Sequence, residues 1–170
     1  MKLAARVLAL VALLSGVAAA SLMAQQRADA ARVRQQLIGT YKLISYVSYD
    51  QNGNTTKQPY SAGQINYDAA GRMSAQLMRA DVPAASGAQA AGVQGGRGGG
   101  SAGYVAYFGR YEIDAEQGIV THHVEGSVSS NMLGSAMPRY YEFSPDGETL
   151  FLQTKNGGRV TGRLQWDRYR

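Results

Sequence analysis

The stretch YVAYFGRYEIDAEQGIVTHHVEGSV, residues 104–128, decides the fold. Apolar and polar residues alternate on both sides of a short acidic turn that ends at Gly118. Alternation, a short loop that contains glycine and renewed alternation predict a β-hairpin. Both histidines of the chain, His122 and His123, lie in the second half of this hairpin.

The register of the hairpin determines which histidine faces inward. If Asp114 faces Ile119 across the turn, one face is apolar and carries a single imidazole, that of His122. The phenols of Tyr107 and Tyr111 share this face. The predicted pairs are Tyr111–His122, Ile113–Val120, Arg110–His123 and Glu112–Thr121. A slip of one residue would exchange the two histidines.

The N-terminus has the pattern of a secretory signal peptide. Two basic residues precede an apolar run over residues 7–20, and small residues follow. We therefore expect residues 1–24 to be a signal peptide, cleaved after Ala20 or Ala24, and the protein to be exported to the periplasm or secreted. The run is short for a membrane anchor, and an uncleaved anchor is the alternative. No stable membrane span is expected after cleavage.

Composition limits the possible partners. The chain contains no cysteine, so an exported domain of this size must depend on its apolar core and not on disulfides. The formal charge is +5, and removal of the two basic residues in the signal segment lowers it to +3. Because the remaining basic residues are scattered, nucleic acid is not an expected partner.

Short alternating segments joined by turn signals continue through residues 37–170. A polar, helix-forming stretch over residues 25–36 is expected to form a short helix before the first strand. In that strand, Tyr41 and Leu43 are expected on one face and Tyr46 on the other. The expected strands and hairpins are 37–50, 54–58, 63–67 with 72–79, 104–128, 138–143 with 148–155, and 159–169.

This pattern predicts an all-β fold, a single antiparallel up-and-down β-barrel of 8–9 strands. Closure removes the exposed edges that so many sequential strands would otherwise leave. A sandwich is the alternative, but the long connections of a Greek key are not evident. Residues 80–103 contain eight glycines and few bulky apolar residues, which predicts a loop. The loop is interpreted as a passive insertion or, alternatively, as a flap over a cavity mouth.

Two ends of the chain carry a resemblance to a known family. Gly39-Thr40-Tyr41 resembles the Gly-x-Trp signature of lipocalin barrels, with tyrosine in place of tryptophan. Arg168 stands where lipocalins have an arginine that packs across that ring. The matching segments are LIGTYKLISY, INYDAAGRMSAQLMR, AYFGRYEID, IVTHHVEGS, PRYYEF and LQWDR. Over residues 37–79 and 104–169 the chain resembles the bacterial and fungal lipocalin-like domain family, which implies a small calyx-like barrel but no agreed activity.

The two histidines do not form a metal-binding pair. Neighbouring residues of a strand point to opposite faces, so His122 and His123 cannot hold one ion inside a barrel. No third ligand stands at a recognisable spacing, and neither a metal nor another cofactor is expected. An inward His122 either bonds to a buried polar group such as Tyr111, or it contacts a ligand or transfers a proton.

The segment Arg139-Tyr140-Tyr141 is a second candidate. The predicted pairs across the next turn are Phe143–Glu148, Tyr141–Leu150 and Arg139–Leu152. They place Arg139 and Tyr141 on the apolar face, where an arginine needs a carboxylate partner. That partner is either a protein group such as Glu125 or a ligand, unless the arginine is simply exposed at the barrel rim. Arg-x-Tyr here weakly resembles the carboxylate clamp of fatty-acid-binding relatives.

The sequence therefore predicts an exported lipocalin-like protein that binds a small hydrophobic or amphipathic molecule in the barrel. The alternative is a cofactor-free isomerase, cyclase or lyase with His122 as acid/base and Arg139 or a tyrosine stabilising an oxyanion. A third interpretation is a solid barrel that acts through its surface. The candidate cavity residues are Tyr107, Tyr111, His122, Asn131, Arg139 and Tyr141.

Overall fold

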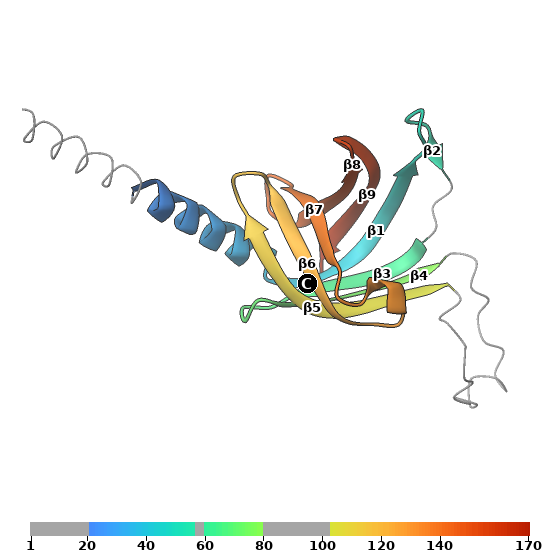
Figure 1. The fold of residues 1–170 in the computed structure, drawn as a ribbon, viewed down its shortest axis with the longest axis horizontal. Coiled ribbons are helices and arrows are strands. Elements are labelled where there is room, and N and C mark those ends of the chain that lie inside the picture. Colours follow the sequence, from blue (N-terminus) through green and yellow to red (C-terminus); the bar gives the residue numbers. More distant parts are fainter. Residues whose placement is uncertain (1–20, 57–59, 80–102) are drawn as a thin grey trace, which may run out of the picture.

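The computed structural model describes residues 21–56, 60–79 and 103–170. Within these residues a helix over 21–37 leads into nine strands (Figure 1). Residues 1–20, 57–59 and 80–102 lie outside the described residues. They include most of the expected signal peptide, the end of the strand expected at 54–58 and nearly all of the glycine-rich loop. The elements are β1 (Gly39–Tyr49), β2 (Thr55–Thr56), β3 (Tyr60–Tyr67), β4 (Arg72–Arg79), β5 (Tyr104–Asp114), β6 (Ile119–Ser127), the 3-10 turn η1 (Ser130–Met132), β7 (Ala136–Phe143), β8 (Thr149–Asn156) and β9 (Arg159–Arg168).

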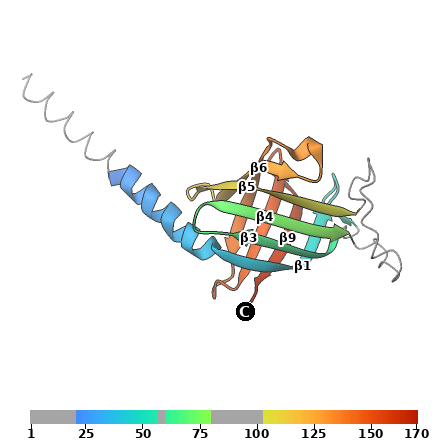
Figure 2. The same ribbon diagram turned by 90° about the horizontal axis from the view of Figure 1, so that it is seen from below.

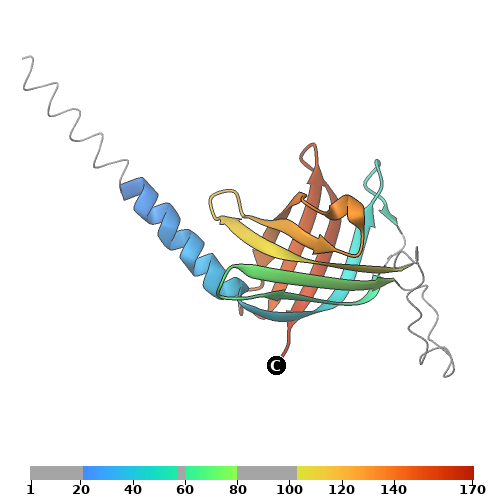
Figure 3. The same ribbon diagram turned by 60° about the horizontal axis from the view of Figure 1, so that its bottom comes forward.

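Eight of the strands in the described part of the chain close into an antiparallel barrel. Strands β3 to β9 each pair with the next in sequence, and β1 pairs with both β3 and β9. The short β2 adds only to the end of β1. In Figures 2 and 3, β3–β5 cross over the β7–β9 wall behind them. The predicted up-and-down barrel is confirmed, and the β1–β9 pairing excludes the sandwich.

The helix packs against one end of the barrel through its last turns. Val33 is 7% exposed and Leu37 is fully buried, so both extend the apolar core. The Arg34 guanidinium lies 5.3 Å from the ring centre of Tyr111. Earlier in the helix, the Gln26 side chain donates to Glu116 in the β5–β6 turn at 3.1 Å, and the start of the helix extends beyond the barrel (Figure 1). In the described residues, no helix is both long and apolar enough to cross a membrane.

Arg168 joins the end of β9 to the end of this helix. Its guanidinium lies 4.7 Å from the ring centre of Tyr41, which confirms the packing that the family resemblance implied. The same group donates to the carbonyls of Gln36 and Ile38, each at 2.7 Å, and to the Tyr41 hydroxyl at 2.7 Å. The Tyr41 hydroxyl in turn donates to the Gln36 carbonyl at 2.9 Å. Carbonyls at the helix end, which have no partner within the helix, are thereby satisfied.

The register predicted for the central hairpin is confirmed. Asp114 faces Ile119 and Tyr111 faces His122, as the acidic turn suggested. His122 is fully buried, while Tyr107 and Tyr111 are 7% and 2% exposed. The apolar face of the hairpin therefore forms part of the barrel interior.

Two strand predictions are wrong in detail. Strand β1 has a bulge between Leu43 and Ser45 in its pairing with β9, which leaves Ile44 48% exposed. The bulge reverses the alternation, and Tyr46 points inward instead of outward. In the β7–β8 pair, Phe143 faces Leu150 and Tyr141 faces Leu152, a slip of two residues from the predicted pairs. A slip of two keeps every side chain on its predicted face.

Candidate functional site

The barrel encloses a cavity of about 220 Å³. The solid barrel considered from the sequence is therefore not what the strands form. Most of the wall is apolar, and it includes a few polar groups, among them those of Tyr107, His122 and Arg139. The lining residues are Tyr46, Tyr60, Ile65, Ala75, Leu77, Val105, Tyr107, His122, Met132, Arg139, Leu152, Thr154, Leu164 and Trp166.

His122 lies between two tyrosines. Its Nε2 is 2.7 Å from the Tyr67 hydroxyl, and its Nδ1 is 3.1 Å from the Tyr107 hydroxyl. Burial, with smaller contributions from the nearby Arg139 and His123, lowers the pKa of His122 to about 3. The imidazole is therefore neutral at physiological pH. The sequence suggested Tyr111 as its partner, but Tyr67 and Tyr107 take that place.

A neutral imidazole bonded on both nitrogens is poorly suited to proton transfer. A general acid at neutral pH would need the imidazolium, which burial strongly disfavours here. The acid/base role remains a prediction that these contacts do not favour.

Arg139 lines the same cavity and has no carboxylate partner within ion-pair distance among the described residues. Its guanidinium donates to the Pro138 carbonyl at 2.9 Å and lies 3.5 Å from the Met137 sulfur. Burial raises the pKa of Tyr107, while the nearby charge of Arg139 lowers it. The place of Arg139 in the cavity lining agrees with the prediction that this face of β7 points inward.

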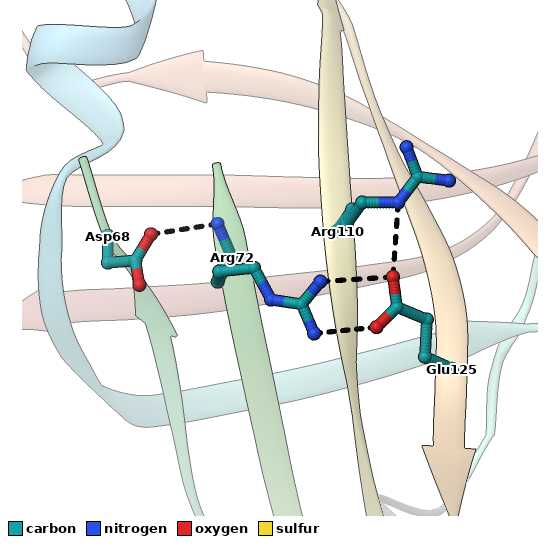
Figure 4. Close-up of polar contacts among 4 residues, drawn as sticks. All are labelled: Asp68, Arg72, Arg110 and Glu125. Atoms are coloured by element: carbon teal, nitrogen blue, oxygen red, sulfur yellow. Dashed lines mark hydrogen bonds and ion pairs between the residues drawn. The ribbon is translucent and has the colours of Figure 1, made fainter. Parts of the chain in front are cut away.

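Glu125, the protein carboxylate suggested as a partner, lies on the outside of the barrel. Both of its oxygens accept hydrogen bonds from Arg72, at 3.0 and 2.6 Å, and one also accepts from Nε of Arg110 at 3.0 Å (Figure 4). Asp68 in the same view accepts from the backbone nitrogen of Arg72. Glu125 is therefore not the partner of Arg139, whose own side chain is partly exposed and also lines the cavity.

Trp166 adds another donor to the wall. The side chain is 1% exposed and lines the cavity, yet its buried Nε1 has no hydrogen-bond partner in the described part of the chain. Buried indole N–H groups usually find an acceptor. An unpartnered one next to an internal space indicates a place for a ligand atom.

The other predicted site residues lie elsewhere. The Tyr111 hydroxyl donates to the Asp68 carbonyl at 2.8 Å, and its ring lies below Arg34 at the helix end. Tyr141 is half-buried and its ring packs against Phe143 at 5.8 Å. Asn131 is exposed in η1. These three are not among the lining residues, so their contact with a ligand remains a prediction.

Sequence reasoning missed several groups at the cavity. Tyr46 turns inward only because of the β1 bulge, which no local pattern signals. Its ring meets that of Tyr60 edge-on at 5.5 Å. Tyr60 begins β3, three residues earlier than the strand predicted from Gly63. Trp166 could have been identified, since alternation in the last strand puts it on the same face as Leu164, which also lines the cavity.

Comparisons with known proteins agree with this architecture. A family model described as a lipocalin-like domain matches residues 38–169. No curated protein matches the chain. A solved structure of a redesigned β-barrel is 9% identical, with a TM-score of 0.41, and the match covers 81% of this chain and 95% of that one. A likeness at that level supports no argument about function.

Proposed function

Because the chain belongs to the lipocalin-like domain family, we propose that it binds one small hydrophobic or amphipathic molecule inside its barrel. The observation that carries the proposal is the cavity of about 220 Å³, whose wall is mainly apolar and includes a few polar groups. Sites for small molecules have this composition, in which apolar contact gives affinity and a few polar groups fix the orientation.

The volume limits the size of the ligand. Drug-sized ligands occupy pockets of roughly 300–1,000 Å³, whereas an apolar cavity of about 150 Å³ in another protein holds benzene. A cavity of about 220 Å³ therefore fits one ring with a short substituent, or an aliphatic chain of similar volume. A long-chain lipid would need the barrel to widen.

Trp166 provides a direct reporter of binding. It is the single tryptophan of the sequence and it lines the cavity, so one indole N–H resonance reports on occupancy. Titration with small neutral probes such as toluene and benzyl alcohol should shift this resonance and raise the unfolding midpoint. If no probe of this size shifts the indole resonance or raises the unfolding midpoint, the proposal is wrong.

A matched pair of variants tests the location. Ala75 is 2% exposed and lines the cavity, so Ala75→Leu should fill part of the space and abolish binding. Ala70 is exposed in the turn between β3 and β4, and Ala70→Leu should bind as the wild type does. Equal binding by both variants would place the probes outside the barrel.

We also propose that the protein works outside the cytoplasm. The support is the signal-like pattern of residues 1–24, which the sequence alone supplies. Mass spectrometry of the mature N-terminus, from cell fractions of the host, should find a chain that begins at Ser21 or Gln25. Full-length protein confined to the cytoplasm would contradict this.

A further inference from the structure

Hydrogen-bond accounting fixes the tautomer of His122. The Tyr67 hydroxyl is buried, does not line the cavity and contacts Nε2 of His122 as its single hydrogen bond within the described residues. A buried hydroxyl proton needs an acceptor, so Tyr67 donates and Nε2 carries no hydrogen. A neutral imidazole holds one proton, which we assign to Nδ1. The opposite tautomer would leave the Tyr67 proton without an acceptor.

This tautomer decides what Tyr107 offers to the cavity. Nδ1–H of His122 donates to the Tyr107 oxygen at 3.1 Å, and the positive charge of Arg139 lies close enough to lower the pKa of Tyr107. The hydroxyl proton of Tyr107 then has no acceptor among the described protein groups. Because Tyr107 lines the cavity, this proton is available to a ligand. His122 thus acts as a positioning residue that turns Tyr107 into a donor.

Three donors therefore belong to side chains that line one internal space: the Tyr107 hydroxyl, the Arg139 guanidinium and Nε1 of Trp166. None of the lining residues, all from the described part of the chain, is an aspartate or glutamate. Arg139 contributes one full positive charge, and no carboxylate among these described lining residues balances it. An amine ligand would meet that charge unopposed, and a neutral ligand would leave it unpaired.

We propose that these three donors bind a single carboxylate. The ligand is then a small monocarboxylic acid, held as its anion with its apolar body against the aliphatic wall. This inference rests on the proposed function and specifies its ligand class. A carboxylate has two acceptor oxygens and one negative charge, which match the planar guanidinium and the two neutral donors. The volume restricts the acid to a short chain or one ring.

Probes of equal size and different charge test the inference. Benzoate, benzyl alcohol and benzylamine share one ring and differ in the group that the donors would meet. Titrations followed by the Trp166 indole resonance should show benzoate binding at least about tenfold tighter than benzyl alcohol, and no binding of benzylamine. Acetate, which lacks the apolar body, should bind more weakly than benzoate.

Variants separate the charge from the cavity. Arg139→Met keeps the length of the side chain and should weaken benzoate binding at least about tenfold, with benzyl alcohol changed less than about twofold. Tyr107→Phe should weaken benzoate binding about threefold to tenfold. Arg32, whose side chain is 74% exposed on the helix, provides the charge-matched control Arg32→Met, which should bind as the wild type does.

The outcomes distinguish this inference from the proposed function. Equal affinity of the wild type for benzoate and benzyl alcohol would overturn the carboxylate site and leave cavity binding intact. Failure of all the probes, toluene included, would overturn both. Nitrogen-15 NMR of His122 gives a measurement that needs no variant: a protonated Nδ1 and a bare Nε2 are expected, and the reverse assignment would refute the donor role of Tyr107.

Discussion

Arg168→Met should detach the helix from the barrel and lower stability by about 3 kcal/mol. The guanidinium makes three hydrogen bonds of 2.7 Å, to the carbonyls of Gln36 and Ile38 and to the Tyr41 hydroxyl. Buried hydrogen bonds from charged donors contribute roughly 1.5–3 kcal/mol each to stability. Because Arg168 is partly exposed, the contribution of each of its bonds lies near or below the lower limit of that range. Stacking on Tyr41 adds about 0.5–1 kcal/mol.

Urea denaturation measures this loss directly. For a domain of this size, about 3 kcal/mol corresponds to a fall of roughly 6–12 °C in the midpoint of thermal unfolding. The control is Arg163→Met, since Arg163 makes one exposed 3.5 Å ion pair with Glu142 and stacks on Phe151. That variant should lose less than about 1 kcal/mol.

Hydrogen exchange locates the effect. The amide of Ile38, which donates to the Arg34 carbonyl at 3.0 Å, should exchange faster in Arg168→Met than the amides of β8. A variant within about 0.5 kcal/mol of the wild type, with unchanged protection at Ile38, would refute the assignment of Arg168 as the link between helix and barrel.

Three further predictions concern the surroundings of His122. Between about pH 7.5 and pH 5, acidification should cost the wild type about 2 kcal/mol, because unfolded His122 binds a proton that the folded ring, with a pKa near 3, does not. Urea titrations at each pH should show this slope lost in His122→Gln and kept in His123→Gln. Tyr67→Phe removes the donor to Nε2 and should lower the free energy of unfolding by about 1–3 kcal/mol, and an unchanged value would contradict the tautomer assigned to His122. The β5–β6 pairing has a bulge between Phe108 and Gly109. Gly109→Ala would push a Cβ into the carbonyl oxygen of His123 and should cost at least about 2 kcal/mol, more than Gly126→Ala, whose Cβ meets only the movable ring of Phe108. The reverse order in urea melts would show that this bulge adapts.

Local patterns were sufficient where one turn controls the geometry. In residues 104–128 the acidic turn aligns two alternating strands, and only one register buries the apolar face of both. The turn at Ser144–Gly147 constrains less. Ser144 donates its backbone N–H to the Thr149 carbonyl, and this bond shifts the pairs by two residues from those predicted. Arg139 still faces inward, because a shift of two leaves the faces unchanged.

Alternation along the chain determined by itself that this protein is a barrel of sequential strands, with His122, Tyr107 and Arg139 on the inner face. Only the tertiary structure decided what they touch. Tyr67 and His122 are 55 residues apart in sequence, and their contact exists because the barrel closes. The β1 bulge that brings Tyr46 inward arises where β1 leaves β3 and continues along β9. Such contacts depend on how distant strands bend to meet, which the period of one strand does not encode.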